Sequence, residues 1–390
     1  MKNIIVCILM IICIGFILII SGPEIKEEKI LVQENRGIFI SYIELSKYLN
    51  CKSKKEAEII VDEMISNVES LGFNEIILQV RSFADAIYKS EIYPWSLVIS
   101  SEEGIDPGYD LLEMFTKKCH EKDISIIAWI NPYRIRNNED ISSISKGSIV
   151  SKHLNTDIVY INNGIYFNPS SDVVLDLIVD GVEEIIKNYD VDGILFDDYF
   201  YPDDDIDIKE YNEYLMNNEY ISKKQYNLNI INNMVKSVYG VCKKYNVKFG
   251  ISPDGNVENN YNKVFADVKK WCSSNQYIDF IMPQIYYGFY NETRGFKKTI
   301  DEWEGYVKDS DVNLRIALAF YKNGTYDEWA KSGSNEWIEN NDIIMREIVL
   351  SRNLDKYDGF SLFRYDYIFS EDKYTDVTLK EIENIKKVLN

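Results

Sequence analysis

The chain has 390 residues, and 63 Asp and Glu against 43 Lys and Arg give it a net charge of −20. This charge argues against a nucleic-acid partner, because binding to phosphates needs a cationic surface that releases their counterions. Hydrophobic residues at 46% and charged residues at 27% are ordinary for a globular protein with a sizeable core.

Histidine is scarce while aromatic residues are abundant. The chain has only two histidines, His120 and His153, so a histidine-based metal site or a Ser-His-Asp triad is close to excluded. Acid–base chemistry must then fall to carboxylates, tyrosines or lysines, and we expect no metal and no cofactor. The 29 Tyr, 17 Phe and 6 Trp exceed the needs of a core. Some of these rings should line a binding surface.

The amino terminus reads as an export signal. Lys2 precedes an apolar run from Ile4 to Ile20, and Pro23 and a charged stretch follow. This pattern is typical of a signal peptide or membrane anchor over residues 1–22, with a linker over 23–35. The absence of a small-x-small cleavage site favours the uncleaved anchor over a cleaved peptide, and a buried helix is the third reading. We expect a protein at the extracytoplasmic face of the cell membrane, or a secreted one.

From residue 36 onward, short apolar runs alternate with longer amphipathic ones. Continuous apolar runs are typical of parallel strands that are buried on both faces. The predicted strands are Gly37–Ser41, Asn74–Val80, Ser125–Ile130, Gly193–Phe196, Lys248–Ser252, Asp279–Pro283, Arg315–Ala319 and Gly359–Phe363. The predicted helices are Lys54–Leu71, Tyr109–Lys122, Asp172–Tyr189, Lys223–Tyr245, Tyr261–Asn275, Phe296–Lys308, Asn335–Arg352 and Asp376–Leu389, with Ser53 and Ser171 as N-caps of the first and third.

Alternating strands and helices in this number predict one α/β domain over residues 36–390, a (β/α)8 barrel of the TIM type. A doubly wound open sheet is the main rival, but no Gly-rich turn follows the first strand. The span exceeds the ~250 residues typical of such barrels. The excess lies in long loops after strands 2, 3 and 4, over Arg81–Gly108, Asn131–Ser170 and Asp197–Ser222. Long loops at strand C-termini are where barrel active sites lie.

The ends of strands 2 and 3 offer polar residues. Arg81 and Asp85 follow strand 2, where they could face substrate or pair as a structural bridge. Trp129, Asn131 and Arg134 end strand 3, and an Asn and an Arg at a barrel mouth suit hydrogen bonding to sugar hydroxyls, although Trp129 could belong to the core.

The end of strand 4 carries the leading catalytic candidates, Asp197 and Asp198. Because side chains alternate along a strand, one carboxylate should point into the mouth and the other toward the helix layer or a neighbouring loop. A carboxylate beside Phe196 and Tyr199 is partly desolvated, which raises its pKa toward that of a general acid. A turn-capping aspartate is the alternative. The run Asp203–Asp205 fits a solvated loop better than a cation site.

Later strand ends add further candidates for substrate binding. They are Asp254 after strand 5, Gln284 and Tyr286 after strand 6, and Asp366 after strand 8, and the rings of Tyr199 and Tyr286 should stack on sugar faces. Two carboxylates flanked by aromatic rings are the equipment of glycoside hydrolysis, in which one protonates the leaving oxygen and the other attacks or activates water. We predict Asp198 as the primary catalytic carboxylate, Asp197 as its orienting neighbour and Asp85 as the partner.

Several sequence blocks together resemble the glycosyl-hydrolase-like 10 family of bacterial cell-envelope proteins. The resembling blocks are Gln79-Val80-Arg81 with Asp85-Ala86-Ile87-Tyr88, Pro94-Trp95-Ser96, Pro107-Gly108-Tyr109-Asp110, Ala128–Arg134, Asp192-Gly193-Ile194, Asp197–Pro202, Ile251-Ser252-Pro253 and Pro283–Tyr286. The resemblance implies a TIM-barrel glycosidase-like fold and peptidoglycan glycan strands as substrate. Asp254 is a departure, since that family usually has an aromatic or apolar residue there.

These observations favour a secreted or membrane-anchored glycoside hydrolase that acts on an envelope polysaccharide. A non-catalytic glycan-binding barrel and a metal-assisted hydrolase that uses the aspartate-rich loop are the alternatives.

Overall fold

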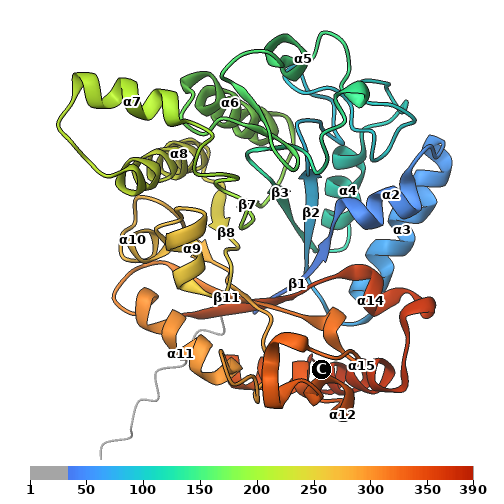
Figure 1. The fold of residues 1–390 in the computed structure, drawn as a ribbon. Coiled ribbons are helices and arrows are strands. Elements are labelled where there is room, and N and C mark those ends of the chain that lie inside the picture. The colour runs from blue at the N-terminus through green and yellow to red at the C-terminus, as the bar shows by residue number, and fades with distance from the viewer. Residues whose placement is uncertain (1–33, 390) are drawn as a thin grey trace, which may run out of the picture. The chain divides into compact units, whose positions relative to one another are not determined.

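A closed barrel of parallel strands forms the centre of the computed structural model, which describes residues 34–389 (Figure 1). The strands lie in the order β10-β11-β12-β1-β2-β3-β7-β8-β9, and β11 also pairs with β9, which closes the sheet. The short β9 and β10 occupy one position between β8 and β11, so the barrel has eight positions. The strands are β1 (Asn35–Ile40), β2 (Glu75–Arg81), β3 (Ser125–Ile130), β7 (Gly193–Phe196), β8 (Lys248–Ile251), β9 (Phe280–Ile281), β10 (Gln284–Ile285), β11 (Asn313–Leu318) and β12 (Tyr357–Leu362).

Helices surround the strands (Figure 1), as predicted for a TIM barrel. The helices between barrel strands are α3 (Lys54–Ser70), α4 (Leu111–His120), α6 (Asp172–Asn188), α8 (Lys223–Lys244), α9 (Val257–Lys263), α10 (Val268–Cys272), α11 (Phe296–Val307) and α13 (Ile343–Ser351), and α15 (Asp376–Leu389) ends the described chain. No helix of the described residues is both long and apolar enough to cross a membrane.

Alternation along the strands divides the core into two layers. Ile76, Leu78 and Val80 of β2 point outward and pack with the helices, whereas Ile77 points inward. The inward residues of the other strands join Ile77 in a compact cluster inside the barrel. They are Phe39, Ile127, Trp129, Leu195, Phe280, Met282 and Ala317.

The amino-terminal end of the barrel is filled by a buried charged group. Arg315 of β11 pairs with Glu75 at 2.8 Å and with Asp358 at 2.9 Å, and its guanidinium stacks over the ring of Phe280. A Cβ on Gly250 of β8 would lie 2.2 Å from that ring, so only glycine leaves room for it.

The long loops after strands 2, 3 and 4 are confirmed, and two of them carry elements of their own. The loop after β3 holds a small antiparallel sheet, and the loop after β7 holds a helix. A fourth long loop, residues 319–342 after β11, was not predicted. The elements that the strand-to-helix loops contain are α2 (Tyr42–Leu49), β4 (Arg134–Arg136), η1 (Ile141–Ser143), α5 (Ile149–His153), β5 (Val159–Ile161), β6 (Ile165–Phe167), α7 (Ile208–Asn217), η2 (Phe320–Lys322), η3 (Glu328–Gly333), α12 (Glu336–Glu339), α14 (Tyr365–Phe369) and η4 (Glu371–Lys373).

Each predicted strand overlaps an observed one, but two predicted helices are interrupted. The region Tyr261–Asn275 is split between α9 and α10, because Phe265 between them has a φ of 52°. The region Asn335–Arg352 is split between α12 and α13. The predicted signal or anchor over residues 1–22 and nearly all of the predicted linker lie outside the described residues.

Candidate active site

Asp197 is a buried carboxylate at the carboxyl end of β7, and three hydrogen-bond donors surround it. The indole Nε1 of Trp129 donates to Asp197 Oδ2 at 3.0 Å, and Nδ2 of Asn131 lies 3.1 and 3.2 Å from the two oxygens. The backbone N–H of Tyr199 donates to Oδ1 at 3.3 Å. A carboxylate that accepts several such bonds is held in one orientation.

The strand alternation of β3 explains why these donors meet Asp197. Trp129 points into the barrel, and Asn131, two residues later, follows it on the same side. The amide oxygen of Asn131 accepts the backbone N–H of Arg134 at 2.9 Å, which turns its NH2 group toward Asp197. Trp129 is therefore a core residue whose indole N–H also holds Asp197, and its predicted contact with substrate stays a prediction.

Asp198 faces the next barrel positions and has fewer donors. Gln284 Nε2 donates to Asp198 Oδ1 at 3.2 Å and to the backbone oxygen of Ser252 at 2.9 Å. The side chain of Asp198 is only partly exposed. The alternation predicted that one of the two aspartates would leave the mouth. Because β7 ends at Phe196, the alternation does not extend to Asp198, and both carboxylates contact residues of barrel-strand ends.

The electrostatics of the two carboxylates differ. Burial, and after it the negative charge of Asp197, raise the pKa of Asp198 to about 7. Burial also raises the pKa of Asp197, but the Arg134 charge and the bonds from Trp129 and Asn131 oppose this. Asp197 has the larger number of hydrogen-bond donors to its charged form, and this favours placing a proton shared by the pair on Asp198.

Arg134 and a group of aromatic rings lie on the β3 side of the site. The guanidinium lies 4.9 Å from the ring centroid of Tyr199 and 5.1 Å from that of Phe83. Its Nε donates to the backbone oxygen of Ser82 at 3.2 Å. Tyr199 is 55% exposed, so its side chain is accessible from solvent.

A second aromatic group lies across the barrel on strands 6 to 8. The ring of Tyr286 packs 5.8 Å from Tyr321 and 5.9 Å from Phe363. The charge of Asp198 contributes to the raised pKa of the Tyr286 hydroxyl, after burial and Tyr321. Tyr321 and Phe363 were not predicted as site residues. The available signal was their position, since Phe363 ends the predicted eighth strand and Tyr321 follows the seventh.

Arg81 and Asp85 do not join this cluster, which corrects their predicted role at the mouth. The register of β2 with β3 shifts between Gln79 and Arg81, and the Arg81 guanidinium packs over Tyr93 and against Gly181 of α6. Both carboxylate oxygens of Asp85 are shielded from solvent. Burial raises the pKa of Asp85 while the charges of Arg136 and Arg81 lower it. Among the described residues no ion pair joins Arg81 and Asp85, so the predicted bridge between them is not formed either, and the charge nearest in effect to Asp85 is that of Arg136.

Asp254 and Asp366 have different surroundings. Asp254 accepts from the backbone N–H of Asn256 at 2.8 Å and from Asn259 Nδ2 at 2.9 Å, and its charge raises the pKa of Asp198. Asp366 is buried at the start of α14, where Lys47 Nζ lies 3.0 Å from both oxygens and the Tyr48 hydroxyl donates to it. Asp254 therefore belongs to the neighbourhood of Asp198, whereas Asp366 serves an ion pair with α2.

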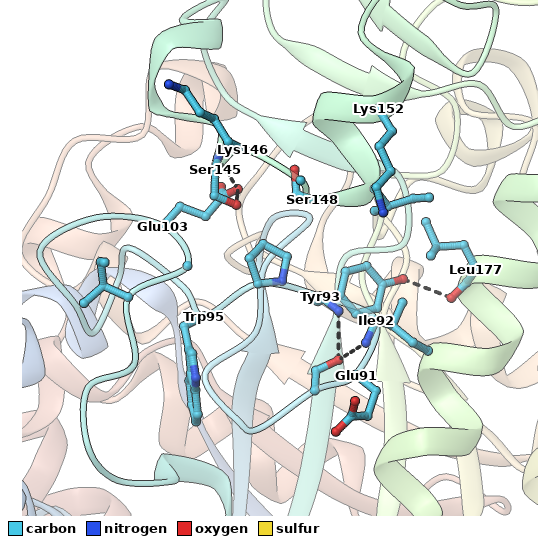
Figure 2. Close-up of a pocket in the computed structure, with 16 residues that line it drawn as sticks. Glu91, Ile92, Tyr93, Trp95, Glu103, Ser145, Lys146, Ser148, Lys152 and Leu177 are labelled. Carbon is cyan, nitrogen blue, oxygen red and sulfur yellow. Dashed lines mark hydrogen bonds between the residues drawn. The ribbon is translucent and has the colours of Figure 1, made fainter.

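A cavity of about 720 Å³ lies apart from these residues, between the loops after β2 and β3 (Figure 2). Its wall includes Tyr93, whose hydroxyl donates to the backbone oxygen of Leu177 at 3.0 Å, and Glu103, which accepts from Ser145. None of the predicted site residues lines it.

The aspartate-rich loop shows no cation geometry. Asp203 accepts from Asn162 Nδ2 at 2.7 Å and from the backbone N–H of Asp205 at 2.8 Å, as a turn residue does. Among residues 34–389, no group of three or more His, Cys, Asp or Glu side chains is arranged to hold a metal ion.

Comparison with known proteins gives a family and a fold. Residues 34–332 match the family model described as glycosyl hydrolase-like 10. The chain is 32% identical over 341 residues to the glycosyl hydrolase YngK of Bacillus subtilis. The aligned region covers 80% of this chain but only 63% of that protein. It is 27% identical over 352 residues to the glycosyl hydrolase DigH of Escherichia coli K12, covering 81% of this chain and 77% of that one.

A solved structure shares the fold at low sequence identity. The glycoside hydrolase domain of PgaB from Bordetella bronchiseptica superimposes with a TM-score of 0.54 at 11% identity, covering 92% of this chain and 99% of that one. At this identity the likeness concerns the fold alone.

Proposed function

Because the chain belongs to the glycosyl hydrolase-like 10 family, we propose that it is a glycoside hydrolase of the cell envelope, with peptidoglycan glycan strands as its substrate. The observation that carries the reaction type is the pair Asp197 and Asp198 at the end of β7, in which one carboxylate has three donors and the other has a pKa of about 7. The resemblance of the sequence to envelope proteins supports the choice of glycan.

Asp198 is the general acid of the proposed reaction. A carboxyl group with a pKa of about 7 is protonated in about half of the molecules at neutral pH, and the protonated form can give its proton to the leaving glycosidic oxygen. Gln284 fixes one oxygen of Asp198 through a 3.2 Å hydrogen bond. No histidine is among the groups that shift the pKa of Asp198, so none lies there to act as the acid in its place.

Asp197 is a positioning residue in this scheme. Its two oxygens are occupied by Trp129 and Asn131, and its negative charge keeps the proton on its neighbour. The positive charge of Arg134 lowers the pKa of Asp197 and so helps to keep Asp197 ionised.

The second carboxylate of the reaction is Asp254 rather than Asp85. Neither oxygen of Asp85 is accessible, so it could not touch a sugar or a water at the mouth. Asp254 is partly accessible and close enough to Asp198 to raise its pKa. In this role Asp254 activates the water that attacks the sugar, or attacks it directly.

The experiment incubates the full-length protein with purified peptidoglycan and with denuded glycan strands, and identifies the products by mass spectrometry. Asp198→Asn should reduce the rate by a factor on the order of 10² to 10⁴ while leaving the melting temperature unchanged. Asp205→Asn, the same change at an exposed carboxylate of the loop that follows, is the matched control and should retain full rate.

Three results would contradict the proposal. Full turnover by Asp198→Asn would move the acid role to another carboxylate. Binding of glycan without any product from the wild-type protein would favour the non-catalytic glycan-binding barrel. Loss of activity in chelator would instead favour the metal-assisted alternative.

The proposed location is the extracytoplasmic face of the membrane. It rests on the apolar run from Ile4 to Ile20, which lies outside the described residues. Fractionation with protease treatment of intact spheroplasts should find the full chain with the membrane and degrade the barrel from outside. Recovery in the cytosol would overturn it.

A further inference from the structure

Three large aromatic side chains are exposed on neighbouring loops at the carboxyl end of the barrel. Tyr290 follows β10 and is 65% exposed, and Tyr326 and Trp329 follow β11 with 63% and 76% exposed. Single exposed rings are ordinary on a protein surface, but three exposed rings on two loops whose backbones touch are a candidate for a shared contact surface. We name these three residues the aromatic platform.

Hydrogen bonds and a close backbone approach join the two loops that carry the platform. The buried Glu336 of α12 accepts the backbone N–H groups of Phe289 at 3.0 Å and Tyr290 at 2.9 Å. The backbone N–H of Glu292 donates to the oxygen of Ala330 at 3.4 Å. A Cβ on Gly333 would lie 2.3 Å from the backbone oxygen of Tyr290, so the chains approach as closely as glycine permits.

The platform is also tied to the proposed active site. Lys322 Nζ donates to the backbone oxygen of Tyr286 and to Asp327 Oδ2, each at 2.8 Å. The other oxygen of Asp327 accepts the backbone N–H of Trp329 at 3.2 Å. The pair Lys322 and Asp327 thus connects the turn at Trp329 to the backbone of Tyr286. The hydroxyl of Tyr286 is close enough to Asp198 for that charge to raise its pKa.

We propose that the aromatic platform is a distal subsite that stacks against sugar rings of the glycan chain, away from the bond that is cleaved. This inference rests on the proposed function and adds to it that the substrate is a chain of several sugars. An aromatic ring offers an apolar face to the C–H face of a pyranose, with one polar edge left to water. A pre-formed platform binds without the cost of ordering its loops, which favours long chains over short ones.

The test measures binding separately from hydrolysis. The full-length Asp198→Asn protein, which is expected not to cleave, is titrated with denuded glycan strands and with an N-acetylglucosamine disaccharide. Adding Trp329→Ala or Tyr290→Ala should weaken binding of the strands about tenfold, as removal of an aromatic anchor does. Binding of the disaccharide should change less than twofold, since it does not reach the platform.

Tyr220→Ala is the matched control, because Tyr220 is 80% exposed and lies on the connection from α7 to α8, away from the platform. This variant should bind the glycan strands as tightly as the parent protein does. Equal affinity of the Trp329→Ala, Tyr290→Ala and parent proteins for the strands would overturn the platform, even if hydrolysis is confirmed. An effect of equal size on strands and disaccharide would also overturn it.

The two proposals can fail independently. If the wild-type protein cleaves nothing but strand binding still depends on Trp329, the hydrolase is wrong and the platform stands. If no variant binds strands at all, the platform is wrong whatever the products of cleavage show.

Discussion

Asp197 and Asp198 are adjacent in sequence but differ in what surrounds them. Asp197 is the last inward-facing position of the β7 line, where Trp129 and Asn131 of the neighbouring strand supply donors. Asp198 lies two residues beyond the ladder, and among the described residues Gln284 is the side chain that donates a hydrogen bond to it. Two neighbouring aspartates can thus take opposite protonation states, because only the first of them meets several hydrogen-bond donors.

The pH dependence of the proposed reaction tests this division of roles. Asp198 must be protonated to act as an acid, so kcat/KM should fall as the pH rises through about 7. Asp197→Asn removes a negative charge next to Asp198, which lowers the pKa of Asp198 and should move the falling limb to lower pH. Rate profiles of the two proteins on the same glycan strands would show the shift. A limb that stays in place would mean that Asp197 has only a structural role.

Residue identities were predictable from sequence where a strand end alone fixed the direction of the side chain. Asn131, Asp197 and Gln284 lie at the barrel end where the sequence placed them, although their predicted roles stay predictions, and the alternation did not fix the direction of Asp198 beyond the end of β7. For Arg81, a shift in register instead turns the guanidinium to the helix layer. Asp85 was placed at the mouth because it follows a barrel strand, but the loop folds its carboxylate inward beside Arg136. Loop packing of this kind leaves no local pattern in the sequence.

The predicted helix starts at Ser53 and Ser171 were both correct, but the two serines differ in geometry. Ser53 accepts the backbone N–H of Glu56, and Glu56 returns a bond to Ser53, forming a capping box. Ser171 makes no side-chain cap bond at the start of α6. We therefore expect the N-cap serine of α3 to contribute more to the free energy of unfolding than the N-cap serine of α6.

Alanine substitution separates these two serines. Ser53→Ala should reduce the free energy of unfolding by about 1 kcal/mol, since it leaves a helix-terminal N–H without its partner. Ser171→Ala, the matched control, should change it by less than roughly 0.5 kcal/mol. Urea denaturation followed by circular dichroism measures both. Equal losses would show that the Ser53 bond contributes nothing beyond the exposed hydroxyl.

Helix continuity was the least predictable property at this scale. The predicted helix Tyr261–Asn275 has enough apolar residues to look continuous, yet Phe265 adopts a left-handed φ of 52° and Asp267 caps a new helix. Phe265 is buried, so packing of its ring outweighs the local cost of that backbone. The unpredicted α2 directly follows β1, behind a capping box of Ser41 and Glu44 that the sequence does show.

At the scale of the whole molecule, the barrel depends on a buried ion triad. Arg315 bridges Glu75 of β2 and Asp358 of β12, so its charge joins three strands of the closed sheet. Burial raises the pKa of Glu75, and the charge of Arg315 opposes this. Removing Arg315 would leave two carboxylates without a cation inside the barrel.

Arg315→Met should destabilise the protein by about 3–5 kcal/mol at neutral pH, the cost of breaking a buried pair. Arg294→Met, which removes the more accessible pair with Glu302, should cost less than about 1 kcal/mol. Denaturant midpoints of both variants measure the difference. A loss for Arg315→Met no larger than that for Arg294→Met would show that the triad is not a source of stability.

The barrel as a whole was predictable because its strands are continuous apolar runs that need cover on both faces. The fourth long loop was missed because part of residues 319–342 was assigned to a single long helix. Its path depends on Glu336 and Gly333 meeting the loop after β10, which are contacts between distant parts of the chain.

The sixth barrel position is the thinnest part of the sheet, since β9 and β10 have two residues each and Pro283 between them has no N–H to donate. In contrast, all of β7 is paired on both sides. Backbone opening should therefore begin at the sixth position, and amide exchange there should be faster than along β7. The consequence is an asymmetric site. The carboxylates directly follow a fully paired strand, while Gln284 and Tyr286 lie on and just after a two-residue strand that should adjust more readily to the sugar it meets.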